Sequence, residues 1–245
     1  DHRDLHSFPT RRSSDLRSPW SSNVLLVRKK DGSLRFCVDF RLVNSKTKKD
    51  WYPVPRTDTS LEILSAGRFF TTLDCTSAYW SIPIHPDHRE KTSFHSPIGS
   101  FQFRQMPFGL CNSGATFSRF MGYVLSGFEY ISCLSYIDDL VIFSSTLESH
   151  LSSLDKILQR ISDSGLTLKP TKCFIAMTEI HFLGHIVSRQ GITPDPQKLL
   201  AVAKFLTPKT ARQVRSFLGL ANFYRRFVLA RSEERRVGKE CRSRW

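Results

Sequence analysis

The sequence lacks any apolar run near 18 residues, the length that a helix needs to cross a membrane. Its first residues show no charged-then-apolar signal pattern and no initiator methionine, as expected of a fragment. It also lacks internal repeats and C-x-x-C pairs, and its cysteines are scattered. We therefore expect a reduced, intracellular protein with no membrane partner and with free thiols at Cys37, Cys75, Cys111, Cys133 and Cys173.

The two ends of the chain encode each other's complement. Back-translation of residues 1–16 gives a DNA string whose reverse complement translates as residues 231–245. The string also resembles translated sequencing-library adapter, whereas a basic, disordered native tail would not explain the complementarity. We therefore expect 1–16 and 231–245 to be adapter-derived artefacts and exclude them from reasoning about the fold. The remainder, about Arg17 to Ala230, can form one large domain or two to three subdomains.

Positive charge is concentrated near the end of the chain. The whole sequence has a formal net charge of +14, and without its two ends, which carry zero and +3, it has +11. Residues 184–230 hold eight Lys or Arg against the single acidic residue Asp195. An excess of this kind indicates a polyanionic partner, with a solvated surface as the alternative.

Short apolar runs predict strands. An Asp31-Gly32 turn between two such runs is the usual signal of a hairpin, here Asn23–Lys30 with Ser33–Phe40. Residues 69–74 (FFTTLD) are rich in strand-forming residues and end on a carboxylate, and 51–55 form a connector broken by proline. Residues 131–143 are apolar except for an acidic pair and predict a tight hairpin.

Four helices are predicted, two from apolar spacing and two from their N-terminal caps. Apolar residues at i, i+3 and i+4 predict one helix from Phe117 and another over 151–161 that ends at Gly165. Asp195-Pro196 is an N-cap followed by a favoured first-turn proline, and Thr210-x-x-Gln213 is a capping box. Because helices and hairpins mix without regular β-α alternation, we predict the α+β class.

The acidic pair Asp138-Asp139 lies at the tip of the predicted hairpin 131–143. Most such pairs are turn residues, but a turn is also what brings either carboxylate to a shared site. Asp74 ends another apolar strand and would converge on Asp138 if the two strands are neighbours. Clustered carboxylates repel one another unless cations neutralise them, and such hard ligands suit Mg²⁺. A pair of Mg²⁺ ions about 4 Å apart supports nucleotidyl transfer.

Seven strings, in order and in spacing, resemble the reverse transcriptase of Gypsy-type long-terminal-repeat retrotransposons. They are SPW (18–20), VRKKDGSLRFCVDFRLVN (27–44), LDCTSAYW (73–80), MPFGLCN (106–112), YIDD (136–139), FLGH (182–185) and FLGLANFYRRF (217–227). The resemblance implies a right-hand polymerase fold, with partial fingers and palm over 17–183 and the primer grip and thumb helices over 184–230. Asn23 and Gly114 depart from the family, which usually has proline there.

The resemblance also implies roles for individual residues. Asp74 and Asp138 would ligate two Mg²⁺ ions, with Mn²⁺ as a substitute, and Asp139 would complete the acidic cluster. Tyr79 would be the steric gate that clashes with a ribose 2′-hydroxyl. Lys29 or Lys30, with Arg35, would clamp the triphosphate. Phe108 and Gly109 would line the nucleotide pocket, Phe182, Leu183 and Gly184 resemble the primer grip, and Lys198, Lys204, Lys209, Arg212, Arg215, Arg225 and Arg226 would contact nucleic-acid phosphates.

Three motifs keep two interpretations. Lys172 follows the break at Gly165, where polymerases often place a lysine that protonates the leaving pyrophosphate; a solvated lysine is the alternative. Asp163-Ser164-Gly165 matches the aspartic-protease triplet, but the end of a helix explains it better. His181, His185 and Cys173 resemble a zinc site without a fourth ligand, and a structural strand is favoured.

The implied function is an RNA-directed DNA polymerase that adds dNTPs to a primer on an RNA or DNA template. In the family it is one part of a polyprotein with protease, ribonuclease H and integrase, and it works in the cytoplasm in a virus-like particle. Two alternatives remain open: an inactive nucleic-acid-binding remnant, and a polymerase that strongly prefers DNA templates.

Overall fold

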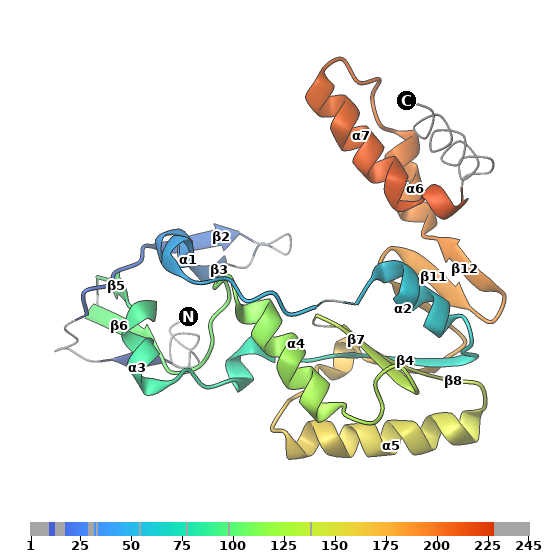
Figure 1. Ribbon diagram of the computed structural model, residues 1–245, viewed down its shortest axis with the longest axis horizontal. Coiled ribbons are helices and arrows are strands. Elements are labelled where there is room, and N and C mark those ends of the chain that lie inside the picture. The colour runs from blue at the N-terminus through green and yellow to red at the C-terminus, as the bar shows by residue number, and fades with distance from the viewer. Residues whose placement is uncertain are drawn as a thin grey trace, which may run out of the picture.

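The central element of the fold is a four-stranded antiparallel sheet (Figure 1). It is seen in a computed structural model that describes residues 10–12, 18–28, 32, 34–53, 55–76, 78–97, 99–137 and 139–227. The strand order is β7 (Cys133–Tyr136), β8 (Asp139–Ser144), β4 (Phe69–Asp74) and β9 (Phe174–Met177). The predicted strand 69–74 and the predicted hairpin within 131–143 are confirmed.

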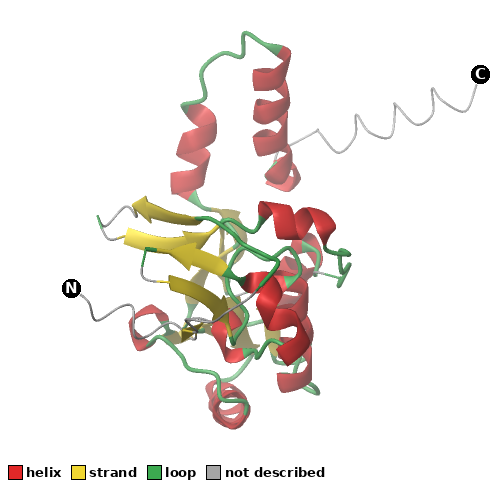
Figure 2. Cartoon of the chain, turned by 90° about the vertical axis from the view of Figure 1, so that its left-hand side faces the viewer, coloured by secondary structure: helices red, strands yellow, loops and turns green. Residues whose placement is uncertain are grey.

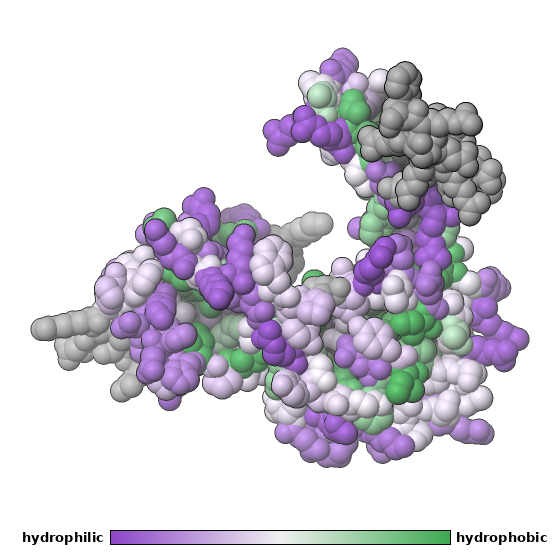
Figure 3. Space-filling view, in the orientation of Figure 1, coloured by the Kyte–Doolittle hydropathy of each residue, from purple (hydrophilic) through white to green (hydrophobic). Residues whose placement is uncertain are grey.

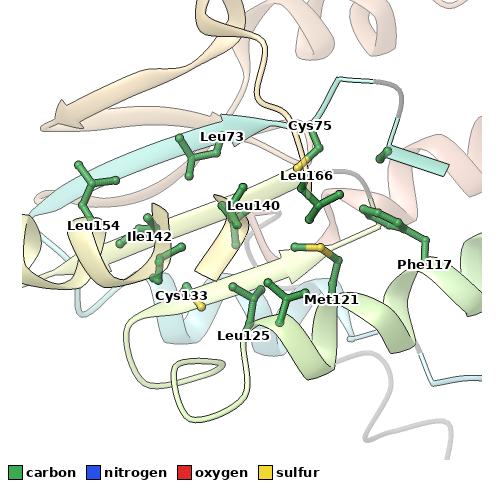
Figure 4. Close-up of a cluster of buried hydrophobic side chains, with 14 of the residues drawn as sticks. Leu73, Cys75, Phe117, Met121, Leu125, Cys133, Leu140, Ile142, Leu154 and Leu166 are labelled. Atoms are coloured by element: carbon green, nitrogen blue, oxygen red, sulfur yellow. The ribbon is translucent and has the colours of Figure 1, made fainter. Parts of the chain in front are cut away.

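Apolar layers cover both faces of this sheet. Alternate residues of a strand point to opposite faces, and in β8 Leu140 and Ile142 pack on one layer while Val141 and Phe143 pack on the other. Each fully buried side chain of this size contributes about 1.5–3 kcal/mol, so the sheet is held firmly from both sides. Figure 4 shows the first layer, where side chains of α4 (Ser113–Val124) and α5 (Leu147–Asp163) meet those of the sheet. The second layer includes α2 (Thr57–Leu64).

Both helices of the first layer were predicted from apolar spacing and are confirmed. In α5 the Thr146 side chain caps the helix by accepting a hydrogen bond from the Ser149 N–H. The helix ends at Asp163, and Gly165 adopts a φ of 72°, which favours glycine. The interpretation of Asp163-Ser164-Gly165 as the end of a helix is therefore confirmed.

A buried polar network joins α5 to the sheet. The Ala176 N–H donates to Thr71 Oγ1 at 3.0 Å, and Thr71 Oγ1 lies 2.7 Å from His150 Nε2. Thr71 and His150 are both fully buried. Ala176 has a φ of 53° where β9 departs from regular pairing with β4, so this hydrogen bond holds a strained strand in place.

Replacing Thr71 by valine should lower the free energy of unfolding by about 1–3 kcal/mol, because the Ala176 N–H loses its acceptor at nearly constant side-chain volume. Thr72→Val on the opposite face of β4 is the matched control and should change it by no more than about 0.5 kcal/mol. Chemical denaturation measures both variants. Equal losses for the two would contradict the importance of this network.

A separate region contains the predicted hairpin, which is confirmed as β2 (Val24–Arg28) and β3 (Leu34–Val38). Its core holds Val38, Phe40, Phe94 and Phe103. The remaining elements of this region were not predicted from the sequence: α1 (Arg41–Lys46), α3 (Pro86–Arg89), β5 (Phe94–Ser96), β6 (Gly99–Phe103) and β1 (Thr10–Arg12), which pairs with β6. Strand β1 falls within the segment 1–16 that we had excluded from the fold.

A second hairpin system leads into two helices that stand away from the sheets (Figures 1 and 2). The predicted caps of both helices are confirmed, with Asp195 accepting from the Gln197 N–H and Thr210 forming a capping box with Gln213. Figure 3 shows the surface hollowed between this pair of helices and the region of the β2–β3 hairpin. The elements are β10 (Glu179–Phe182), β11 (His185–Ser188), β12 (Gly191–Pro194), α6 (Pro196–Ala203) and α7 (Ala211–Phe223).

Of the helices among the described residues, not one combines the length and apolar character needed to span a membrane. Five cysteines, at positions 37, 75, 111, 133 and 173, are free thiols in the structure, as the sequence predicted. Burial raises the pKa of the Cys133 thiol to about 12, which keeps that side chain protonated and unreactive.

Two glycines should respond oppositely to alanine. Gly114 lies in the first turn of α4, and a Cβ there would meet open space, so Gly114→Ala should raise the free energy of unfolding by about 0.5–1 kcal/mol. Gly165 also has open space but a φ of 72°, so Gly165→Ala should lower it by roughly 1–2 kcal/mol. Thermal and denaturant unfolding of both variants tests this, and a loss of stability in Gly114→Ala would contradict it.

Candidate active site

Two carboxylates meet at one edge of the central sheet. Asp74 ends β4 and Asp139 begins β8, and the two residues lie directly opposite each other in the antiparallel register. Cross-strand partners project from the same face with Cβ atoms about 4.5–5.5 Å apart. The two strands are therefore neighbours in one sheet, which the sequence analysis left as a condition, and their register brings Asp74 to Asp139. Asp138 lies outside the described residues.

The hairpin that carries Asp139 turns within two residues, because Tyr136 pairs with Asp139. Ile137, in the turn, has a φ of 56°, an uncommon value for a β-branched residue. Such strain is maintained only when the flanking structure determines it. Here the flanking strands are buried between the two apolar layers, so the rigid sheet fixes the position of the turn.

A lysine contacts this pair of carboxylates. Lys172 Nζ lies 2.9 Å from Asp74 Oδ2. The backbone explains its position, because the Lys169 N–H donates to the Asp74 carbonyl at 2.9 Å and holds the short 3-10 helix Pro170–Lys172 against the end of β4. Of the two interpretations of Lys172, its place beside the acidic pair favours a role in the site over a purely solvated side chain.

The electrostatics of the pair favour a cation. Partial burial raises the pKa of the Asp139 carboxyl, the charge of Asp74 raises it further, and Lys172 opposes the rise. Carboxylate oxygens that repel each other in this way fit Mg²⁺, which prefers hard oxygen ligands. Within the described part of the chain, no three His, Cys, Asp or Glu side chains form a metal-binding group. The third predicted ligand, Asp138, falls outside that part.

Replacing Asp139 by asparagine should stabilise the metal-free protein, because it removes a charge that is partly buried and is repelled by Asp74. For an acid whose pKa is raised on folding, the stabilising contribution is complete below the unfolded value near 3.8 and is lost as pH rises through the folded pKa. The advantage of Asp139→Asn should therefore grow as pH rises from about 4 to 7. Asp139 is an exposed residue, so the effect should be modest. An advantage that is constant with pH would contradict this assignment.

A cavity of about 540 Å³ adjoins the carboxylates. Asp74, Asp139 and Lys172 line it, and Phe182 of β10 lines it as well. Phe182 begins the turn of the β10–β11 hairpin, where Leu183 and Gly184 have φ values of 47° and 76°. The structure therefore connects the predicted primer-grip segment to the predicted metal site through one open space.

Two aromatic residues that the sequence analysis predicts to contact the nucleotide, Tyr79 and Phe108, lie side by side. Tyr79, in the 3-10 helix Ala78–Ser81, has its ring centroid 5.0 Å from that of Phe108 and 5.5 Å from that of Phe117. Phe108 is 52% exposed, so one side of its ring is open to a ligand. Gly109 follows with a φ of 97°, a value that only glycine adopts without strain. The structure thus brings Tyr79 and Phe108 together, and their contacts with a nucleotide stay a prediction.

Sequence reasoning missed the residue that holds this turn. Asn44, on α1, donates through Nδ2 to the Gly109 carbonyl at 2.8 Å, and its Oδ1 accepts from the Cys111 N–H at 2.8 Å. The side-chain amide of Asn44 thereby makes two backbone hydrogen bonds to the segment that follows Phe108, as a neighbouring strand would do. Its position at the end of the string VRKKDGSLRFCVDFRLVN was the available signal.

The remaining predicted residues lie on other elements of the fold. Arg35 is exposed on β3, opposite Val27, while Lys29 and Lys30 lie outside the described residues. All seven predicted phosphate-contacting side chains of the closing segment are exposed, namely Lys198, Lys204, Lys209, Arg212, Arg215, Arg225 and Arg226. His185 is buried in β11, as expected for a structural strand, and its Nδ1–H donates to the Leu183 carbonyl at 2.9 Å.

Comparison with known proteins agrees with this geometry. The family model described as reverse transcriptase (RNA-dependent DNA polymerase) matches residues 27–187. The Pol polyproteins from transposon 297 and transposon gypsy of Drosophila melanogaster are each 37% identical to this chain, over 216 and 218 residues. Each alignment covers 86% of this chain and 20% or 21% of the relative, so the chain spans about a fifth of the length of these curated relatives.

Solved structures share the fold. A foamy viral protease-reverse transcriptase in complex with double-stranded DNA has a TM-score of 0.83 at 24% identity, over 95% of this chain and 40% of that chain. The native prototype foamy virus protease-reverse transcriptase has a TM-score of 0.64 at 26% identity, over 92% and 30%. The predicted α+β, right-hand polymerase fold is confirmed. The reverse transcriptase family model matches more than half of this chain, and the chain therefore belongs to the reverse transcriptase family.

Proposed function

We propose that this chain is the polymerase part of a Gypsy-type retrotransposon polyprotein and adds dNTPs to the 3′-hydroxyl of a primer on an RNA template. The observation that carries the proposal is the pairing of Asp74 with Asp139 across β4 and β8, next to Asp138 in sequence. This arrangement provides the clustered hard ligands that nucleotidyl transfer needs.

Three carboxylates would hold the metal ions. Asp74 and Asp138 would hold two Mg²⁺ ions, or Mn²⁺ as a substitute, with Asp139 completing the cluster. When bound, such ions would supply activation of the attacking hydroxyl and charge neutralisation at the leaving phosphate. The pKa of Asp139 is raised first by partial burial and then by the charge of Asp74, and a bound cation would offset both effects, which supports this assignment.

Other residues would position the substrate and move a proton. Lys172 holds its ammonium 2.9 Å from Asp74 Oδ2, close enough to the acidic cluster to donate a proton to the departing pyrophosphate. Tyr79 and Phe108 would stack beneath the incoming nucleotide, with Tyr79 excluding a ribose 2′-hydroxyl. Arg35, with Lys29 or Lys30, would clamp the triphosphate from the β2–β3 hairpin.

The nucleic acid would lie in the hollow seen in Figure 3. The turn at Leu183 and Gly184 would hold the primer end, and the exposed cations of α6 and α7 would contact phosphates without reading sequence. The similar foamy viral enzymes were solved with double-stranded DNA and with RNA/DNA hybrid, which supports a primer–template partner for this chain. Protease, ribonuclease H and integrase domains are the other expected parts of the polyprotein, which would act in cytoplasmic virus-like particles.

Primer extension on matched RNA and DNA templates tests this proposal. We expect extension on both, abolished by Asp138→Asn. Extension on DNA templates alone would favour the runner-up, a DNA-templated polymerase. Binding of primer–template without extension on either template would favour an inactive nucleic-acid-binding remnant.

The native segment is shorter than the whole chain in this proposal. We infer that residues 17–230 carry the function and that 1–16 and 231–245 are adapter-derived. Strand β1 pairs at the edge of β6 through three residues only, so its removal leaves the β5–β6 pairing in place. A chain lacking both ends should extend primers at the wild-type rate, and a large loss of rate would contradict the inference.

A further inference from the structure

Both peptide oxygens of the Leu183–Gly184 turn accept hydrogen bonds. The Leu183 carbonyl accepts from His185 Nδ1–H at 2.9 Å. The Gly184 carbonyl accepts twice, from the Tyr224 hydroxyl at 3.2 Å and from the Asp195 N–H at 3.1 Å. Because Leu183 has a φ of 47°, an unfavourable value for leucine, these bonds hold a strained turn in one geometry.

The two bonds to Gly184 come from the ends of two different helices. Asp195 is the N-cap of α6, and Tyr224 is the C-cap of α7. No residue of α7 with a described side chain is buried, but Tyr224, directly after it, is 6% exposed. The ends of both helices therefore meet the β10–β11 hairpin at the same peptide oxygen.

An aromatic cluster surrounds the same contact. The His185 ring lies 5.3 Å from Phe223, 5.5 Å from Tyr224 and 5.6 Å from Phe227, measured between centroids. A Cβ on Gly184 would come within 3.0 Å of the Tyr224 hydroxyl oxygen, so the absence of a side chain lets the hydroxyl approach. The ring contacts hold Tyr224 in place, and the Tyr224 hydroxyl makes the hydrogen bond to the turn.

We propose that Tyr224 is a positioning residue that couples α7 to the Leu183–Gly184 turn, and thereby sets where the primer 3′ end lies relative to Asp74. The proposal rests on the proposed function, in which this turn holds the primer. A movement of α7 would displace the Gly184 carbonyl, because the C-cap residue Tyr224 donates a hydrogen bond to that oxygen at 3.2 Å. The hydroxyl acts through the turn and does not itself touch the reacting atoms.

Tyr224→Phe removes the hydroxyl and keeps the ring, and Tyr123→Phe, at an exposed position of α4, is the matched control. We expect Tyr224→Phe to slow single-turnover nucleotide addition about 5- to 10-fold, with the Kd for primer–template changed less than 2-fold. Tyr123→Phe should leave both unchanged. A general loss of structure would instead weaken binding and rate together, and that outcome or an unchanged rate would overturn the proposal.

Hydrogen–deuterium exchange at residues 183–185 separates this inference from the proposed function. Tyr224→Phe should speed exchange there and not at the control turn 189–190 between β11 and β12. If the wild-type chain binds primer–template but extends nothing, the proposed function fails, and exchange then decides the coupling alone. Unchanged exchange would overturn the coupling, and faster exchange would support it.

Discussion

Replacing Asp74 by asparagine will reduce the rate of nucleotide addition by on the order of 10³-fold while leaving the fold intact. Asp74 lies directly opposite Asp139 in the register of β4 and β8, so in the proposed function it supplies one of the charges that hold the metal ions. Asparagine keeps the shape but removes that charge. Rapid-quench measurement of single-nucleotide addition gives the rate, and an unfolding curve checks the fold.

Asp155→Asn provides the control for Asp74→Asn. Asp155 is an exposed residue of α5, on the helix that covers the opposite face of the sheet. It should leave the rate unchanged. If Asp74→Asn and Asp155→Asn behaved alike, the pairing of Asp74 with Asp139 would have no catalytic meaning and the assignment of the site would be wrong.

Replacing Lys172 by glutamine should slow the chemical step by roughly 10²- to 10⁴-fold, as expected when a proton donor is lost. The geometric reason is the contact of Lys172 Nζ with Asp74 Oδ2 at 2.9 Å. Binding of primer–template should stay intact, because Lys172 is one of many cations on the surface. Single-turnover kinetics with a separate binding titration distinguishes the two effects.

Lys169→Gln is the matched control for Lys172. Lys169 is three residues earlier and exposed, and it contacts Asp74 through its backbone N–H, which the substitution keeps. It should leave the chemical step unchanged within about twofold. Equal rates for the Lys172 variant and the wild type would restore the interpretation of Lys172 as a solvated surface lysine.

Local patterns predicted the elements that carry the metal site. Strand β4 was bounded correctly because FFTTLD joins strand-forming residues to a terminal carboxylate, and the caps at Asp195 and Thr210 located the start of two helices. Family resemblance added Tyr79 and Phe108, whose rings the structure brings together. These features depend on residues close in sequence or on motifs with a fixed order.

What the sequence did not reveal depends on contacts between distant segments. The pairing of Asp74 with Asp139 depends on the register of β4 and β8, 65 positions apart, which no local pattern contains. Asn44 acts on Gly109 and Tyr224 acts on Gly184, each through one side chain across long separations. Helix α2 was missed because its apolar residues, Leu61, Ile63 and Leu64, span a single turn, too short a pattern to distinguish from the connector before it.

The most direct test of the central claim is extension of a labelled primer on an RNA template by the purified chain as Mg²⁺ is titrated. The account predicts that extension begins as Mg²⁺ is added, stops with a chelator and returns when Mg²⁺ is restored. Tight binding of primer–template with no added nucleotide at any Mg²⁺ or Mn²⁺ concentration would contradict it.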